Sequence, residues 1–188
     1  MKKMILTALV AVASLSANAQ VWVGGSLGFN YNKLSVGNAD LKTTTFSIAP
    51  EVGYTLGDNL DIAIALSDSY ASQKDGDSMN EFTINPYVRY TFFQTGKVGF
   101  FVDGGFSVGS TDGIVDDNGI IQELDKNATV WGVGIRPGVK FAASDKVTFV
   151  ASLGGLGWRQ VKSGNIKNQD FGFNVDGNAL KFGVYYTF

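Results

Sequence analysis

One short phrase occurs four times in this chain, and it alternates apolar residues with small or polar ones. The copies are Pro50–Leu56, Pro86–Phe92, Pro137–Phe141 and Phe182–Phe188. In each copy an apolar residue, a valine and an aromatic residue occupy every second position, which is the period of a β-strand. The starts of the copies lie 36, 51 and 45 residues apart, enough for one β-hairpin each. Four hairpins predict an all-β fold, an eight-stranded antiparallel up-and-down barrel.

Eight segments of the chain show this alternation, joined by connections that are short and long in turn. The segments are Val21–Tyr31, Thr44–Leu56, Leu60–Ser67, Glu81–Phe92, Val98–Gly109, Thr129–Phe141, Val147–Leu156 and Ala179–Phe188. The predicted long connections are residues 32–43, 68–80, 110–128 and 158–178. Tight turns at one end and long loops at the other are typical of an outer-membrane barrel.

Residues 1–19 have the pattern of a secretory signal peptide, which leaves 20–188 as a single barrel domain. Lys2 and Lys3 precede an apolar core, Met4–Leu15, and a small-residue cleavage box follows at residues 17–19. This core is too short to span a membrane as a helix. The chain has no cysteine, so disulfides do not stabilise the exported domain.

Alternation alone does not say which face of the barrel is outside, because a soluble lipid-binding barrel has its apolar face inward. Small residues dominate the other face, as at Gly24, Gly53, Gly105 and Gly138, and they suit the crowded lumen of a narrow barrel. Aromatic residues cluster on the apolar face near both strand ends, as in interfacial girdles. They are Tyr54, Tyr90, Phe92, Phe141, Tyr186 and Phe188 at one end and Phe29, Tyr31, Phe46, Phe82 and Trp131 near the other. The apolar face is therefore predicted to contact lipid.

The last strand, Leu180–Phe188, ends on phenylalanine and resembles the assembly signal of bacterial outer-membrane barrels. Together with the repeated Pro-x-Val-x-aromatic strand ends and the Ala19-Gln20 junction, it makes the chain similar to a known family. This family is the small outer-membrane β-barrel proteins of the OmpX and OmpA-barrel type ("porin family") of Bacteroidetes-type bacteria. The resemblance implies an outer-membrane location, contact with lipid and lipopolysaccharide, and insertion by the barrel assembly machinery. It also implies a recognition role for Phe182, Val184, Tyr186 and Phe188.

Charged residues on the lumen face are predicted to form a structural network. They are Glu51, Asp61, Arg89, Asp103, Arg136 and Lys140. An unpaired buried charge costs several kcal/mol, so these side chains should pair with one another. The chain has no histidine and no cysteine, which removes the usual general base and the thiol nucleophile. We therefore predict no catalytic residue, no cofactor and no metal.

Two of the predicted long loops are rich in charged residues, and each allows a ligand-binding interpretation beside a structural one. The third long loop carries Asp112, Asp116, Asp117, Glu123 and Asp125, but their spacing differs from a calcium-loop pattern, and the tip of an extended hairpin explains it better. The fourth is basic, with Arg159, Lys162 and Lys167. Either it meets lipopolysaccharide phosphates or it is a solvated loop.

Two functions are consistent with such a barrel. The first is a structural or surface-interaction protein, a monomer whose extracellular loops bind a ligand that the sequence does not identify. The alternative is a narrow passive channel for small solutes or ions. Eight strands favour the first, because barrels open into channels at about sixteen strands, and because bulky residues point inward. These are Trp22, Tyr87, Arg89, Phe101, Arg136, Lys140 and Tyr185. The net charge of −2 gives no basis for binding nucleic acid.

Overall fold

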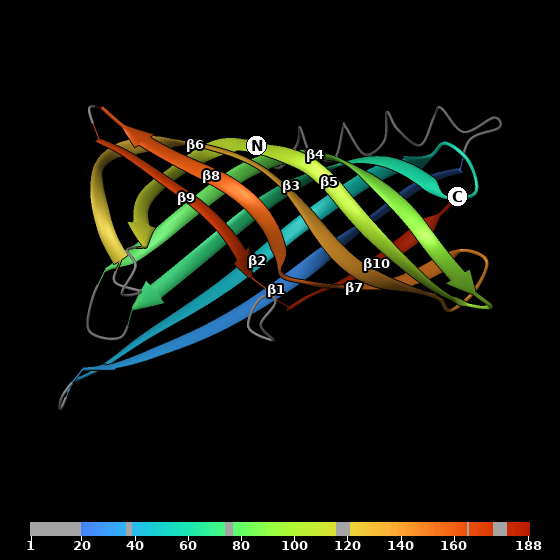
Figure 1. The fold of residues 1–188 in the computed structure, drawn as a ribbon, viewed down its shortest axis with the longest axis horizontal. Coiled ribbons are helices and arrows are strands. Elements are labelled where there is room, and N and C mark those ends of the chain that lie inside the picture. Colours follow the sequence, from blue (N-terminus) through green and yellow to red (C-terminus); the bar gives the residue numbers. More distant parts are fainter. Residues whose placement is uncertain (1–19, 37–38, 74–76, 116–120, 165, 175–179) are drawn as a thin grey trace.

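The computed structural model describes residues 20–36, 39–73, 77–115, 121–164, 166–174 and 180–188. Ten strands occupy them (Figure 1). Their bounds are β1 Gln20–Val36, β2 Ala39–Thr55, β3 Leu60–Gln73, β4 Ser78–Thr95, β5 Val98–Val115, β6 Ile121–Ala142, β7 Val147–Leu153, β8 Gly155–Ser163, β9 Ile166–Asn174 and β10 Leu180–Thr187.

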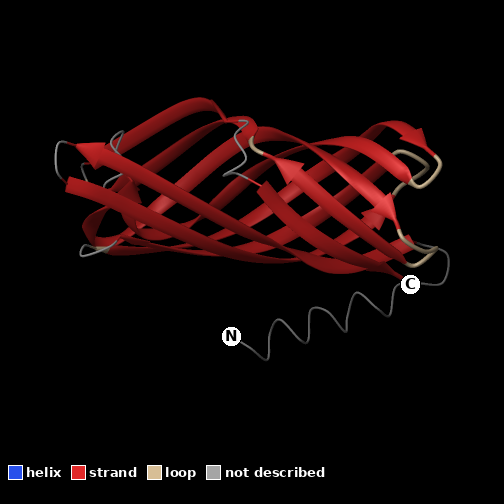
Figure 2. Ribbon diagram, turned by 90° about the horizontal axis from the view of Figure 1, so that it is seen from below, coloured by secondary structure: helices blue, strands red, loops and turns tan. Residues whose placement is uncertain are grey.

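Eight of these strands close into an antiparallel ring in the order β1-β2-β3-β4-β5-β6-β7-β10, and β10 returns to β1. The closing pairs run from Trp22 opposite Thr187 to Gly28 opposite Lys181. Figure 2 shows the strands crossing the length of the molecule at a common tilt. Within the described residues, no helix is long and apolar enough to cross a membrane. The predicted eight-stranded barrel is confirmed.

The apolar face of the strands is outside. In β4, Phe82, Ile84 and Val88 are exposed, whereas Thr83 and Tyr87 between them are buried. All eleven aromatic residues assigned to the two girdles are exposed on this outer face. A closed barrel with an apolar exterior satisfies its backbone hydrogen bonds internally, which is the requirement for spanning a bilayer with strands. The predicted direction of the apolar face is confirmed.

Much of the sequence predicted as long loops is strand. The hairpins continue beyond the alternating segments, to β1 and β2 of 17 residues each and β6 of 22 residues. About 9–11 tilted residues span the hydrocarbon core of a bilayer. The additional length projects from one end of the barrel, beyond the part that must present an apolar face to lipid, so strict alternation is not needed there.

The seventh predicted strand, Val147–Leu156, is divided into two pieces, whereas the eighth, Ala179–Phe188, is the single strand β10. Gly154 separates β7 from β8 and has a φ of 50°, a left-handed conformation that favours glycine. The predicted loop 158–178 contains most of β8 and all of β9, which pair as a hairpin. In the described residues β9 pairs only with β8, and β1 beyond Gly28 pairs only with β2.

The three prolines lie where the barrel wall is interrupted on one side. The β2–β3 ladder lapses at residues 49–50, and the β4–β5 ladder lapses at residues 85–86. At residues 136–137, β6 changes its neighbour from β8 to β7. Each proline still pairs with the strand on its other side. Since proline has no N–H to donate, it is tolerated where the ladder toward one neighbour is already absent.

Candidate functional site: a plug in the barrel lumen

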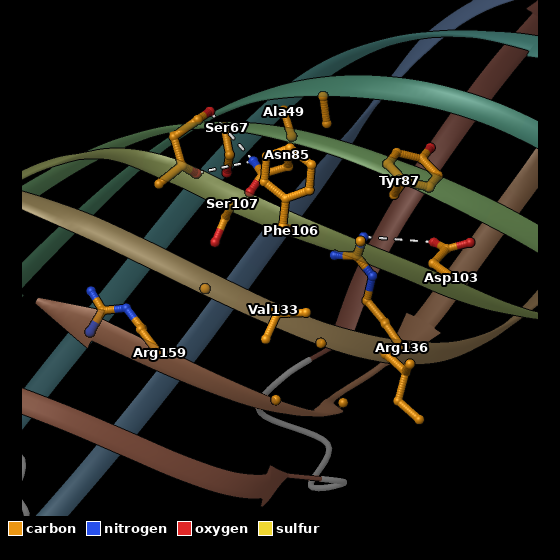
Figure 3. A pocket seen from close by; sticks show the side chains of 18 of the residues that line it. Ala49, Ser67, Asn85, Tyr87, Asp103, Phe106, Ser107, Val133, Arg136 and Arg159 are labelled. Atoms are coloured by element: carbon orange, nitrogen blue, oxygen red, sulfur yellow. Dashed lines mark hydrogen bonds and ion pairs between the residues drawn. The ribbon is translucent and has the colours of Figure 1, made fainter.

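Four charged residues form one row across four neighbouring strands, with alternating sign. Asp61 on β3 lies opposite Arg89 on β4, Arg89 lies opposite Asp103 on β5, and Asp103 lies opposite Arg136 on β6. Arg89 donates from Nε to Oδ1 of Asp103 at 2.7 Å and from Nη2 to Oδ2 at 2.9 Å. Nη2 of Arg136 lies 3.6 Å from Oδ2 of Asp103 (Figure 3). Asp103 is therefore the carboxylate between two cations, and Asp61 instead accepts a hydrogen bond from Thr55 at 2.7 Å.

Glu51 is held by hydroxyl groups rather than by cations. Its Oε1 accepts a hydrogen bond from Ser26 at 2.8 Å, and its Oε2 accepts one from Tyr87 at 2.5 Å and one from Tyr185 at 3.0 Å. The hydroxyl of Tyr185 also accepts a hydrogen bond from Arg89 at 3.4 Å, which links the two groups. The sequence predicts that the lumen charges pair with one another; Arg89, Arg136 and Lys181 line the same small cavity as Glu51, but among the described residues Glu51 forms no ion pair. The tyrosines were recognised as bulky lumen residues, but their role as donors depends on a strand register that the sequence does not reveal.

An aromatic layer packs around the guanidinium of Arg89. Its Cζ lies 4.0 Å from the ring centroid of Phe101, and the rings of Trp22 and Tyr185 stack with centroids 4.3 Å apart. Trp22, Tyr87, Phe101 and Tyr185 belong to one buried apolar cluster with Ala65 and Val150. A cation over an aromatic face in a desolvated setting is stabilised by about 2 kcal/mol.

Glycines make room for these aromatic residues. Each aromatic side chain of the plug lies directly opposite a glycine on a neighbouring strand: Trp22 opposite Gly53, Tyr87 opposite Gly105, Phe101 opposite Gly138 and Tyr185 opposite Gly24. A Cβ at Gly138 would lie 2.2 Å from Cζ of Phe101, which no real contact allows. The abundance of glycine on the lumen face therefore has a packing cause.

The plug leaves almost no free space. The cavity among its side chains measures about 10 Å³, the lower limit for one water molecule. Beyond it, toward the long hairpins, lies a larger cavity of about 680 Å³, bounded at the plug by Glu51, Tyr87, Asp103 and Arg136. Serines and glycines form much of its wall, including Ser67 and Ser107 (Figure 3). Further along the long hairpins, two clusters of buried apolar residues fill part of the lumen. One cluster is Ile114, Ala128, Val130 and Val161, and the other is Ala71, Met79 and Ile121.

The remaining predicted lumen residue lies apart from this network. Lys140 is opposite Gly99 near the short turns, on the other side of the plug from the large cavity. Among the described residues it forms no ion pair. A second lumen lysine, Lys181, lines the large cavity and also lacks an ion pair there.

The residues of the predicted assembly signal share one face. Phe182, Val184, Tyr186 and Phe188 are exposed on the lipid side of the last strand and its end. The rings of Tyr186 and Phe188 meet edge to face with centroids 5.2 Å apart, and the backbone N–H of Phe188 donates to the carbonyl of Val21 at 3.1 Å. The residues are thus accessible from the membrane, and their recognition role stays a prediction.

The acidic third loop and the basic fourth loop of the sequence analysis differ in where their charged side chains lie. Asp112 accepts hydrogen bonds from the backbone and side chain of Asn80, whereas Asp116 and Asp117 lie outside the described residues. No group of three or more acidic residues that could hold a metal is found in the part of the chain that the structure describes. In the basic loop, Arg159 points into the lumen and forms an ion pair with Glu81.

The fold and the plug define a small, closed transmembrane β-barrel. A family model for the outer membrane protein β-barrel domain matches residues 4–188. The chain belongs to that family and is located in the bacterial outer membrane.

One of the similar solved structures supports this fold. The barrel is similar to Neisserial surface protein A (NspA), with a TM-score of 0.56 and 19% identity, over 89% of this chain and 97% of that one. The N-terminal barrel of Pseudomonas aeruginosa OprF aligns with a TM-score of 0.47 and 17% identity, over 91% and 100% of the two chains. No curated protein is significantly similar in sequence.

Proposed function

We propose that this protein is a non-enzymatic surface-interaction barrel, a monomer that acts through its extracellular half while its lumen stays closed. The observation that carries this proposal is the plug. Arg89, Asp103, Glu51 and the four aromatic residues cross the lumen, and the cavity between Glu51, Arg89, Phe101 and Tyr185 measures only about 10 Å³. No continuous water column passes through such a space.

The long hairpins supply the surface. Strands of 17 to 22 residues exceed by far the length that crosses a bilayer, so each long hairpin rises well beyond the membrane. Exposed segments held on a rigid scaffold are where binding proteins usually carry their function. The ligand would be a macromolecule or surface component outside the cell, met by the projecting strands.

The lumen chemistry supports a structural role. Its buried carboxylates already accept hydrogen bonds, Glu51 from three hydroxyl groups and Asp103 from a bidentate guanidinium. A chain without histidine or cysteine also lacks the most common general base and thiol nucleophile.

The alternative, a narrow channel, is favoured by one observation. A cavity of about 680 Å³ lies beyond the plug, so part of the lumen is hollow. A movement of the plug side chains would open a path.

Osmotic swelling of proteoliposomes tests the proposal. Liposomes that contain the folded protein and trap a large dextran are diluted into an isotonic solution of a small uncharged sugar. We expect swelling no faster than in protein-free liposomes. Rapid swelling would overturn the closed-lumen proposal in favour of the channel.

A further inference from the structure

The outward face of the β8–β9 hairpin is ordered in rows of increasing polarity. Ladder partners on this face are Trp158 with Phe171, then Gln160 with Gln169, then Lys162 with Lys167 nearest the tip. Phe171 is 75% exposed, and both lysines are exposed. Nε2 of Gln169 donates to Oε1 of Gln160 at 3.1 Å, which joins the middle row. The hairpin thus passes from aromatic to amide to cation over three successive rows.

The rows can be placed relative to the membrane through β6. Trp131, a residue of the outer aromatic girdle, lies opposite Gln160, and Thr129 lies opposite Lys162. Aromatic girdles mark the level of the membrane interface. The two lysines are one row further out, which is the level of the lipid headgroups.

The lysines are held together by the hairpin itself. The last ladder pair is Ser163 with Ile166, and Gly164 has a φ of 56°, in the left-handed region that favours glycine. The ladder, continuous from Gly155 with Asn174 to this pair, fixes the register, so the Cβ atoms of Lys162 and Lys167 stay about 5 Å apart. Like charges directly opposite each other destabilise a sheet unless a counter-charge is present. Among the described residues neither lysine forms an ion pair.

We propose that Lys162 and Lys167 bind a phosphate group of the outer-leaflet lipid, lipopolysaccharide. A phosphate between the two ammonium groups would supply the missing counter-charge. The acyl chains of this lipid would lie along Trp158 and Phe171. The amides of Gln160 and Gln169, in the row between the aromatic residues and the lysines, would contact the polar headgroup. Because β9 has no strand partner beyond β8 in the described residues, this side of the lysine pair is open to a headgroup. Arg159, the third basic residue of the segment, is excluded because it pairs with Glu81 in the lumen.

Native mass spectrometry of the folded protein in a neutral detergent tests the site. Lipid A that carries phosphate and the same lipid A with its phosphates removed are each titrated into wild type and into a Lys162→Gln/Lys167→Gln double variant. We expect wild type to bind the phosphorylated lipid about tenfold more tightly than the dephosphorylated one. The double variant should bind both lipids equally weakly.

A matched control uses Lys97 and Lys146, two exposed lysines at the short turns of the opposite end. In a micelle both ends are accessible, so a Lys97→Gln/Lys146→Gln variant should keep the wild-type preference. Retention of the shift between boiled and unboiled samples on a gel shows that each variant is folded. Three outcomes would each overturn the proposal. Wild type could bind the two lipids equally, the Lys162/Lys167 variant could keep the preference for the phosphorylated lipid, or the control variant could lose that preference to the same extent. None of these outcomes depends on whether the lumen conducts.

Discussion

Trp22 on β1 lies directly opposite Gly53 on β2, and a Cβ at Gly53 would lie 2.2 Å from Cζ2 of the indole. The tryptophan can fill the lumen only because this position has no side chain. The pairing predicts that Gly53→Ala costs about 1–3 kcal/mol of stability through overpacking.

Gly57 provides the control for this prediction, because no atom lies within 4 Å of a Cβ placed there. The temperature at which unboiled protein loses its folded gel mobility should fall for Gly53→Ala and stay near wild type for Gly57→Ala. Equal midpoints for the two variants would contradict the packing account.

The bidentate pair of Arg89 and Asp103 should behave as a unit. Both side chains are at most 5% exposed, so Arg89→Met leaves a buried carboxylate with only the 3.6 Å contact to the guanidinium of Arg136. We expect a loss of about 3–5 kcal/mol. The Arg89→Met/Asp103→Leu double variant should recover much of it, because neither fully buried charge remains and Arg136, which loses its partner Asp103, is 34% exposed. Denaturant unfolding of the two single variants and the double variant measures the coupling, and strictly additive losses would argue against it.

The thermal stability of the barrel should depend on which residue replaces Glu51. Glu51→Gln keeps one oxygen acceptor for three hydroxyl donors, whereas Glu51→Ala removes every acceptor and leaves Tyr87 and Tyr185 without this partner. A buried polar group that loses its partner costs about 1–3 kcal/mol. Thermal midpoints should therefore fall in the order wild type, Gln, Ala. A variant with alanine as stable as wild type would show that the hydroxyl groups do not need the carboxylate.

Phe188 tests the assembly signal. The side chain is exposed to lipid, so its contribution to packing is modest, and its loss should matter mainly during insertion. Phe188→Asp is expected to lower the amount of protein in the outer membrane strongly, whereas Phe188→Tyr, which keeps the aromatic ring, should insert normally. Quantitative immunoblots of outer-membrane fractions compare the two, and wild-type abundance of Phe188→Asp would refute the recognition role.

The barrel itself could be predicted from the sequence, because one face in lipid and one in the lumen impose strict alternation within the membrane. Near the membrane interface and beyond it this constraint weakens, and β8 and β9 show the result. They form a regular hairpin in a segment of mixed polarity that the sequence suggested to be a loop. The divide at Gly154 was also unpredictable, since nothing local distinguishes its left-handed conformation from that of the extended glycines nearby.

From the sequence, the lumen residues could be identified as a set, but the partner of each one could not be predicted. Arg89, Asp103 and Arg136 were placed on the inward face by phase alone, and their order in one row follows from strand register. Register depends on turns and ladder pairing, and a shift of two residues would preserve every inward side chain while changing every partner. For this reason the hydroxyl partners of Glu51 emerged only from the structure.

Single-channel recording in planar bilayers tests the plug most directly. Wild type should show no steady conductance, because the aromatic and charged side chains close the lumen. A Trp22→Ala/Phe101→Ala variant, once shown to be folded by its gel mobility, should show small conductance steps because it removes two rings of the plug. A steady wild-type conductance that is unchanged in this variant would contradict the account, since current would then pass without regard to the plug.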